Sequence, residues 1–208
     1  MRIDKIMNGI CKKIILLFPF ILMACQANQK ARPTCELVSI SRVESALNDP
    51  RGFEGQFTQI WSNGNQSEGR IVYIPGKLRL NYETPSTMIV VAKGKKMVAK
   101  NFDDHSVTHI GLARNPLGLM LNSPVHLSSP ILVTAIQKGT QALQISLASG
   151  DNPSQGLLTL RFQDVNGQLT LDQMQAIDVR KRQTIMNISN VHMGLSVKNN
   201  YFDYPDQP

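Results

Sequence analysis

Residues 69–97, GRIVYIPGKLRLNYETPSTMIVVAKGKKM, decide the fold class because they contain several strand patterns separated by tight turns. Within them, residues 77–83 alternate strictly. Leu78, Leu80 and Tyr82 share one face of the expected strand, and the charged or polar residues between them share the other. A strand that is apolar on one face and polar on the other is typical of an antiparallel sheet with one covered side.

The same period of two continues on both sides of this stretch, with turn residues between the segments. The expected strand segments are 53–61, 69–74, 77–83, 88–92, 97–102, 107–110, 131–136, 143–147, 157–162, 168–172, 175–179, 182–188 and 191–195. Helical patterns are scarce, and strands do not alternate with helices. The sequence therefore predicts a mainly β (α+β) fold of about ten or eleven antiparallel strands, curved or rolled.

Two short segments have helical character instead. Apolar residues recur at helical spacing over residues 37–47, and Pro50 follows this helix and prevents its continuation. A second, shorter helix is expected over residues 117–121, with Asn115 as its N-cap and Pro116 at its first position.

The N-terminus predicts export. Residues 1–25 contain four basic residues and an apolar run of eleven residues, which is too short to span a bilayer as a helix and indicates a secretory signal peptide. Its end, Leu22-Met23-Ala24-Cys25, resembles the lipobox of bacterial lipoproteins, in which the cysteine is lipidated. Ordinary cleavage near Ala24 or Ala27 would instead release a soluble periplasmic protein, and both routes stay open. Residues 26–36 are polar and predict a leader or tether, followed by a single domain over residues 37–208.

The number of cysteines and the net charge exclude some further classes of protein. Only Cys35 lies in the body of the chain, so a disulfide framework is excluded, although a Cys25–Cys35 bridge stays open if neither cysteine is lipidated. Loss of residues 1–25 lowers the net charge from +7 to +4. The remaining basic clusters, near residues 93–100 and 180–182, suit solvated turns or contact with an anionic membrane surface or acidic partner. They lack the interleaved aromatic residues of single-stranded nucleic-acid grooves.

The sequence contains no recognisable catalytic or metal-binding motif. His105 and His109 would lie ~13 Å apart along a strand, too far to share one metal ion. Asp103 and Asp104 fall where a hairpin turn is due, and aspartate is a turn residue. We therefore expect no enzyme, no metal and no cofactor.

Residues spread along nearly the whole chain carry a resemblance to a known family. They are Phe53-Glu54-Gly55-Gln56-Phe57-Thr58-Gln59, Gly69, Pro75-Gly76-Lys77-Leu78-Arg79, Tyr82, Thr84-Pro85, Ile89-Val90-Val91, Gly94, Asn115-Pro116-Leu117, Leu119, Leu121, Phe202 and Pro205. In this order and spacing they resemble the family of the outer-membrane lipoprotein carrier protein LolA. The resemblance implies an unclosed β-barrel of about eleven antiparallel strands with a lid of short helices. It also implies an apolar cavity for acyl chains. We expect the cavity to be lined by Phe53, Phe57, Trp61, Ile74, Leu78, Leu80, Tyr82, Met88 and Val90, under a lid that includes Leu117, Met120 and Leu121.

The implied function is a monomeric periplasmic carrier. It would take lipoproteins from an inner-membrane ABC transporter and pass them to an outer-membrane receptor. A protein of the same fold anchored through Cys25, acting as lipid receptor or sensor, is the alternative, and an envelope enzyme is a third. One position departs from the family, which has an arginine before Pro-Gly-Lys that hydrogen-bonds to the lid, whereas this chain has Ile74. Counting by alternation places Ile74 with Leu78 on the cavity face, so we expect an apolar or weak closure.

Overall fold

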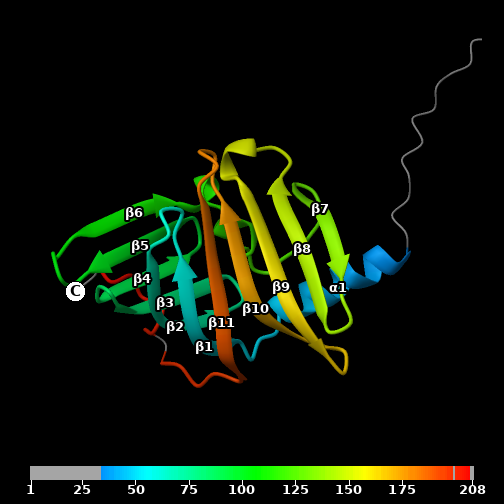
Figure 1. The fold of residues 1–208 in the computed structure, drawn as a ribbon, viewed down its shortest axis with the longest axis horizontal. Helices are drawn as coiled ribbons and strands as arrows, with labels where there is room; N and C mark the ends of the chain where they lie inside the picture. Colours follow the sequence, from blue (N-terminus) through cyan, green and yellow to red (C-terminus); the bar gives the residue numbers. More distant parts are fainter. Residues whose placement is uncertain (1–33, 199, 207–208) are drawn as a thin grey trace, which may run out of the picture. The chain divides into compact units, whose positions relative to one another are not determined.

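A computed structural model describes residues 34–198 and 200–206. Its strands form one antiparallel sheet of eleven strands in the order β6-β5-β4-β3-β2-β1-β11-β10-β9-β8-β7 (Figure 1). The strands are β1 (Phe53–Ile60), β2 (Gln66–Ile74), β3 (Lys77–Thr84), β4 (Met88–Lys93), β5 (Lys96–Asn101), β6 (Val107–Gly111), β7 (Ile131–Lys138), β8 (Ala142–Ser149), β9 (Leu157–Val165), β10 (Gln168–Ile177) and β11 (Gln183–Met193). This confirms the predicted fold class.

The strand order explains why the barrel does not close. Pairing of β1 with β11 joins the first strand to the last, so β6 and β7 become the two edges of the sheet. The connection between those edges carries two 3-10 helices, η1 (Leu112–Arg114) and η2 (Pro116–Leu119). The predicted cap is present, since the Asn115 side chain accepts a hydrogen bond from the Leu117 backbone N–H at 2.9 Å. A third 3-10 helix, η3 (Pro153–Gln155), joins β8 to β9.

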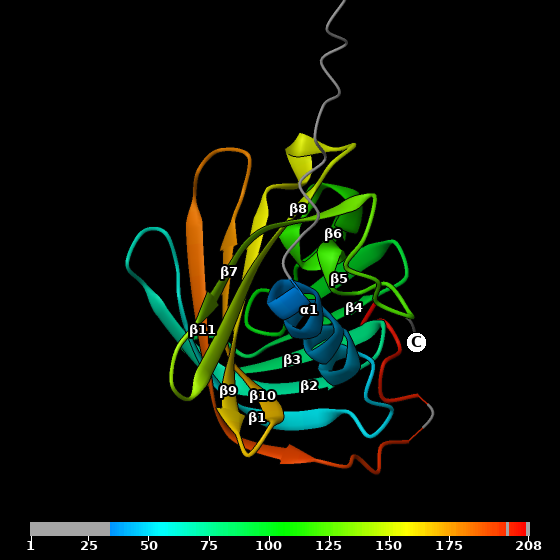
Figure 2. The same ribbon diagram turned by 90° about the vertical axis from the view of Figure 1, so that its right-hand side faces the viewer.

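The helix α1 (Thr34–Leu47) lies in the concave side of the sheet, as Figure 2 shows. It buries Ile40, Val43 and Leu47 in the main apolar core, whereas Leu37 near its start is exposed. The same core contains the inward side chains of both halves of the sheet and the segment that follows η2. None of the helices among the described residues is long and apolar enough to cross a membrane.

A smaller apolar cluster covers part of the outer face. Val72 from β2 and Val91 from β4 pack there against Phe202 of the C-terminal segment. The Arg79 side chain donates a hydrogen bond to the Tyr201 backbone carbonyl at 2.7 Å, and the Tyr204 hydroxyl donates one to the Lys93 carbonyl at 2.7 Å. These contacts fasten the C-terminal segment across the sheet.

Several boundaries differ from the sequence prediction. The first helix begins at Thr34, so the last three residues of the expected leader 26–36 are helical. The expected breaks within 168–179 and 182–195 are absent, because β10 and β11 run on through register shifts opposite β9 and β1. The predicted signal peptide, with Cys25, lies outside the described residues.

Candidate functional site

A cavity of about 450 Å³ lies inside the curved sheet, beneath η2. Its wall comes from β1, β3, β4, β5 and β6 on one side and from β9, β10 and β11 on the other. The lining residues are Gln59, Trp61, Ser62, Leu80, Tyr82, Met88, Val90, Met97, Ala99, Thr108, Ile110, Asn115, Pro116, Leu117, Leu158, Met174, Ala176, Asp178, Arg182, Thr184 and Met186. The wall is mainly apolar, and the small side chains of Ala99 and Ala176 leave the interior open. Such a space suits a flexible apolar ligand.

Six of the expected site residues line this cavity. They are Trp61, Leu80, Tyr82, Met88, Val90 and, from the expected lid, Leu117. Five others are buried in the core around it: Phe53, Phe57, Leu78, Met120 and Leu121. These five support the wall and the covering segment rather than facing the open space.

The prediction for Ile74 is wrong. Pro75 and Gly76 form a two-residue turn, so Ile74 pairs with Lys77 while Tyr73 pairs with Leu78. Residues paired across neighbouring strands point to the same face, and the alternation therefore shifts by one at this turn. Ile74 packs in the outer cluster with Val72 and the C-terminal segment, on the opposite side of the sheet from the cavity.

Tyr73 takes the position facing the lid. Its hydroxyl donates a hydrogen bond to the Leu47 carbonyl at the end of α1, at 2.9 Å, and lies 3.5 Å from the Met120 carbonyl after η2. The side chain is almost wholly buried, and burial raises the pKa of Tyr73, which keeps the hydroxyl protonated as a donor. Of the expected apolar or weak closure, the apolar alternative is therefore wrong, since one polar side chain joins the sheet to both covering elements, and a weak closure stays a prediction.

Further hydrogen bonds join α1 to the connection that follows η2. The Asn48 side chain donates to the Val125 carbonyl at 2.8 Å and accepts from the Val125 N–H at 2.7 Å. The Glu44 carboxylate accepts from the Leu127 N–H at 2.6 Å. Because these bonds use backbone groups of an irregular segment, they fix its path across the open side of the sheet.

Four methionines contribute flexible, polarizable side chains to the cavity wall: Met88, Met97, Met174 and Met186. The sequence shows that methionine is frequent but not that these four converge. Met174 and Met186 come from the C-terminal half of the sheet and reach the others only through the β1–β11 pairing. No local pattern could have brought them together.

The cavity also contains a polar pair, of which Tyr82 was expected from the sequence and Gln59 was not. The Tyr82 hydroxyl donates a hydrogen bond to Gln59 Oε1 at 2.6 Å, and both side chains are buried. Burial raises the pKa of Tyr82, so this phenol stays neutral in the physiological range. Alternation along β1 was the available signal, because Gln59 shares its face with Phe53 and Phe57.

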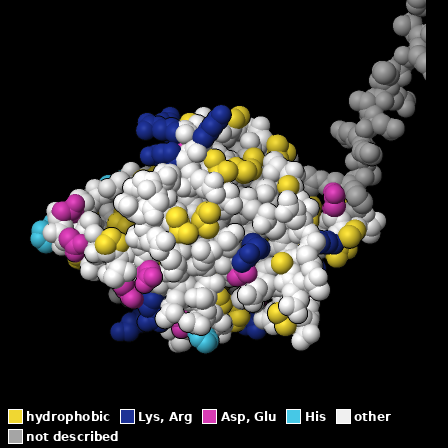
Figure 3. Space-filling view, viewed as in Figure 1, with side chains coloured by type: hydrophobic (Ala, Val, Ile, Leu, Met, Phe, Trp, Pro, Cys, Tyr) yellow, Lys and Arg dark blue, Asp and Glu magenta, His cyan; other side chains and the backbone are white. Residues whose placement is uncertain are grey.

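The opening of the cavity is marked by its exposed lining residues, which include Trp61, Ser62 and Arg182. Trp61 is 37% exposed and donates from Nε1 to Ser67 Oγ at 3.0 Å. Arg182 forms an ion pair with Asp178 at 2.7 Å, and the Arg182 backbone N–H, together with that side chain, holds the pKa of Asp178 below its usual value. In Figure 3, Lys and Arg side chains gather over the end of the sheet where β10 turns into β11.

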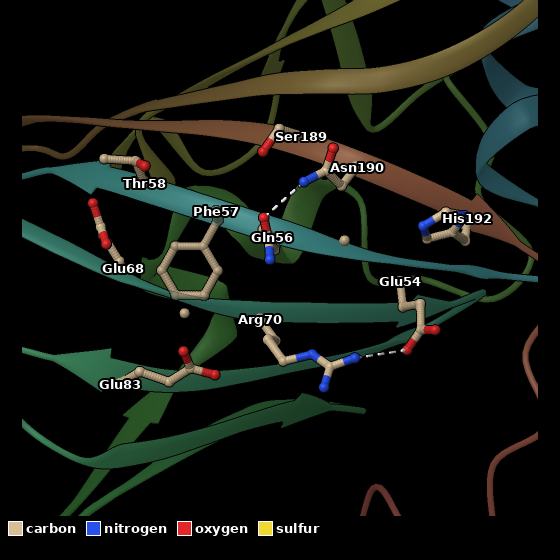
Figure 4. Close-up of a pocket in the computed structure, with 12 residues that line it drawn as sticks. Glu54, Gln56, Phe57, Thr58, Glu68, Arg70, Glu83, Ser189, Asn190 and His192 are labelled. Carbon is tan, nitrogen blue, oxygen red and sulfur yellow. Dashed lines mark hydrogen bonds and ion pairs between the residues drawn. The ribbon is translucent and has the colours of Figure 1, made fainter.

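Two other hollows lie away from the inner cavity and have more polar and charged linings. One, of about 580 Å³, is shown in Figure 4, where Arg70 lies 3.6 Å from Glu54 and Asn190 donates to Gln56 at 2.8 Å. The other, of about 750 Å³, lies by the β2–β3 and β4–β5 turns and is ringed by Lys77, Lys93, Lys95 and Lys96. Both are open to solvent and lined mostly by polar or charged residues, whereas the inner cavity is lined mainly by apolar ones, so we assign the candidate site to the inner cavity.

Catalytic groups do not converge in the inner cavity. Gln59 and Tyr82 are neutral and bonded to each other, and Asp178 is paired with Arg182 at the opening. Within residues 34–198 and 200–206, no three His, Cys, Asp or Glu side chains group closely enough to hold a metal ion. Asp104 accepts a hydrogen bond from the Ser106 N–H at 2.9 Å, which makes it a turn residue as expected.

Comparison with known proteins agrees with this geometry. Residues 48–205 match the sequence profile of the family described as outer membrane lipoprotein carrier protein LolA. Outer-membrane lipoprotein carrier proteins from three strains of Coxiella burnetii are 22% identical over 174 residues, which cover 79% of this chain and 81% of theirs.

Solved structures with a similar arrangement are more distant in sequence. A LolA superfamily protein from Nitrosomonas europaea has a TM-score of 0.48 and 7% identity, covering 80% of this chain and 96% of its own. The Mycobacterium tuberculosis lipoprotein LppX has a TM-score of 0.39 and 7% identity, covering 78% and 98% respectively.

Proposed function

The chain belongs to the outer membrane lipoprotein carrier protein LolA family, and from this premise we propose that it is a periplasmic carrier of lipoproteins. It encloses their acyl chains in the inner cavity and moves them from the inner to the outer membrane. The observation that carries the proposal is the apolar cavity of about 450 Å³ under a covering of short elements. Family membership supports the class of cargo, and the cavity supports the manner of binding.

The energetics of acyl chains explain why a carrier is needed. Each methylene group contributes ~0.8 kcal/mol when it leaves water, so a chain of roughly fourteen methylenes costs on the order of 11 kcal/mol to expose. A lipoprotein therefore does not cross an aqueous compartment unaided. A cavity wall of leucine, valine and methionine side chains replaces the membrane interior without any reactive group.

Release requires that the carrier bind the chains no better than the membrane does. The covering elements make this reversible, because α1 is held to the sheet and to the segment after η2 by packing and by hydrogen bonds, such as those of Tyr73 with the Leu47 carbonyl and of Glu44 with the Leu127 N–H. Entry of an acyl chain would displace them. We propose an inner-membrane lipoprotein-releasing ABC transporter as the donor and an outer-membrane lipoprotein receptor as the acceptor.

A second candidate is a membrane-anchored protein of the same fold that receives or senses lipids. The Cys25 sequence context favours it, because a lipidated Cys25 would confine the protein to one membrane. Mass spectrometry of the mature N-terminus distinguishes the two. An unlipidated N-terminus supports the shuttle, and a diacylglyceryl group on Cys25 supports the anchored protein.

The direct test is extraction of a purified triacylated lipoprotein from vesicles. The carrier should form a soluble equimolar complex, seen by gel filtration with light scattering. A variant with arginine in the wall, Met88→Arg, should fail to form it, while Lys95→Ala at the distant lysine cluster should behave as the wild type. Absence of a complex with the wild-type protein would reject the carrier function.

A further inference from the structure

We propose that Gln59 and Tyr82 form a polar subsite that binds the carbonyl oxygen at the head of an acyl chain. The ligand class is thereby a fatty acyl ester or amide rather than any apolar molecule of suitable size. The inference deepens the proposed carrier function and rests on it.

The first observation is a buried, hydrogen-bonded polar pair in a mainly apolar wall. Gln59 is 4% exposed and Tyr82 is 6% exposed, and both line the cavity. Met186 lies opposite Gln59 in β11, and Met88 lies opposite Tyr82 in β4. Burying an amide costs free energy unless its hydrogen-bonding groups are satisfied, so this pair calls for a ligand or a purely structural explanation.

Hydrogen-bond accounting favours a ligand. The bond from Tyr82 Oη to Gln59 Oε1 leaves both N–H groups of the Gln59 amide without a partner among the residues that the structure describes. Every fully buried side-chain nitrogen or oxygen atom among the described residues has a partner. Because Gln59 Nε2 has none, this atom must be accessible, and Gln59 lines the cavity. If the amide is turned over, Nε2 donates to Tyr82 Oη, and the tyrosine hydroxyl hydrogen and one amide hydrogen become free instead. In both orientations the pair presents donors, and the complementary ligand atom is an acceptor.

The pair is fixed in place and aimed by its neighbours. The Tyr82 ring contacts the Phe57 ring edge-to-face, with centroids 5.0 Å apart and planes at 77°. A preorganised donor costs little further ordering when a ligand binds. The subsite is therefore rigid, unlike the methionine-rich wall around it.

The place of Gln59 along β1 matches the order of groups in an acyl chain, which begins with a carbonyl group and continues as hydrocarbon. Trp61, exposed at the opening just after β1 ends, is followed inward by Gln59, which is buried and lines the cavity. Alternate residues are ~7 Å apart, so the donors lie about one such step inside the opening. A ligand with a carbonyl near the opening and hydrocarbon beyond it fits this order. A plain hydrocarbon would leave the donors unpaired.

Two lipopeptides test the subsite. One carries two ester-linked palmitoyl chains, and the other is its dihexadecyl ether counterpart, which keeps the chains but lacks both carbonyl groups. The wild-type protein should bind the ester about 5–10-fold more tightly, the value of one hydrogen bond in a site that excludes water. Isothermal titration calorimetry measures both affinities.

Substitutions test whether Gln59 and Tyr82 cause the preference for the ester lipopeptide. The double variant Gln59→Leu/Tyr82→Phe should bind both lipopeptides with equal affinity, whereas Gln59→Leu alone leaves the Tyr82 hydroxyl free to donate and should keep part of the preference. Gln163→Leu, which makes the same exchange at an exposed position of β9 that does not line the cavity, should keep the preference. Circular dichroism confirms that each variant is folded.

The outcomes separate the two proposals. Equal wild-type affinities, or a preference that survives loss of Gln59 and Tyr82, would overturn the subsite while leaving the carrier function intact. If the wild-type protein binds neither lipopeptide, the carrier function fails and the subsite fails with it.

Discussion

Tyr73 and Ile74 are adjacent in β2, yet their side chains serve opposite faces of the sheet. The family position that normally holds a lid-binding arginine corresponds to Ile74, but in this chain the hydrogen bond to the lid comes from the residue before it. A polar tie between sheet and covering elements is therefore present in a different side chain. This makes the two residues separable by mutation.

Tyr73→Phe should loosen the covering without changing the wall of the cavity. Loss of the buried hydroxyl leaves the Leu47 carbonyl without this partner, and we expect a loss of about 1–2 kcal/mol in the free energy of unfolding. Amide hydrogen exchange should also quicken at the end of α1. Urea denaturation measures the first effect. Tyr201→Phe, whose hydroxyl makes only a 3.5 Å contact with Asn81, is the matched control and should change stability by less than ~0.5 kcal/mol.

Ile74→Arg should free the C-terminal segment rather than alter the cavity. A charged side chain placed in the outer apolar cluster weakens the packing of Phe202, with an expected loss of about 1–2 kcal/mol. Trypsin should then cleave faster at Lys198, as followed by mass spectrometry. Binding of a hydrophobic dye in the cavity should stay as in the wild type, whereas Met88→Arg in the cavity wall should reduce it. Reduced dye binding by Ile74→Arg would contradict this assignment.

Sequence could predict the inward face of single strands but not the relation between strands. Alternation correctly placed Leu80 and Tyr82 on the cavity side, because side-chain direction within one strand has a fixed period. The prediction failed for Ile74 because the alternation was continued through a two-residue turn, and that turn pairs Ile74 with Lys77. The length of that turn is visible in the sequence as Pro75-Gly76, so this error was avoidable. The convergence of Met174 with Met88 was not predictable in this way, since it depends on pairings between distant strands.

At the scale of elements, the pairing of β2 with β3 depends on a close approach of their backbones. The register shifts between Glu68 and Gly69, and a Cβ atom at Gly69 would lie 2.0 Å from the Asn81 carbonyl oxygen. Backbone atoms in a paired strand cannot move aside as a flexible side chain can. Only glycine fits here, and this gives the conspicuous Gly69 of the sequence a structural reason.

Gly69→Ala should therefore destabilise the protein by at least ~3 kcal/mol, or prevent folding, because the added methyl group forces the two strands apart. Gly111→Ala is the control, since a Cβ there meets no atom within 4 Å, and it should leave stability unchanged or raise it by up to ~1 kcal/mol. Thermal unfolding monitored by circular dichroism compares the two. Equal melting temperatures would show that β2 and β3 are not held at this distance.

An ion pair and hydrogen bonds also join α1 to the end of β9 and the turn that follows it. The Arg42 guanidinium bonds both carboxylate oxygens of Asp164, at 2.8 and 2.7 Å, and the Gly167 carbonyl at 3.0 Å. Its hydrogen bonds hold the pKa of Asp164 below the usual value for aspartate. A carboxyl group whose pKa is lowered on folding stabilises the protein above its unfolded pKa of ~3.9, and that contribution disappears as the pH falls through the lower folded pKa.

Asp164→Asn should consequently be less stable than the wild type at pH 7, and the difference should be smaller at pH 2.5, because the stabilising contribution of the wild-type carboxylate falls progressively below the unfolded pKa of ~3.9. Urea denaturation at the two pH values measures this. Arg42→Gln should cause a similar loss at pH 7, and the double variant should cost little more than either single one, because both remove the same interaction. Additive losses would mean that the two residues act independently.

At the scale of the whole molecule, the open topology is what makes a cavity. Eleven strands curl around α1 without joining β6 to β7, and the connection between these edges covers the gap with η1 and η2. The class of fold was predictable because strand patterns recur along the chain. The β1–β11 pairing that fixes the strand order was not, since no short-range signal links residues so far apart. The unclosed shape entered the sequence analysis only through family resemblance.

The volume of the cavity should limit how much of an acyl chain it can hold. A substitution that fills the cavity should therefore weaken binding without destabilising the fold. Ala176 lies in the wall on β10, and Ala176→Trp would occupy space that an acyl chain needs while adding apolar contacts to a region that is otherwise open. We expect binding of the ester lipopeptide to fall by about tenfold or more, equivalent to ~1.4 kcal/mol, with little change in melting temperature. Ala135→Trp adds the same bulk on an exposed position of β7 and should bind as the wild type. If Ala176→Trp binds normally, the acyl chain lies elsewhere, and the two hollows away from the inner cavity offer no comparable apolar surface to hold it.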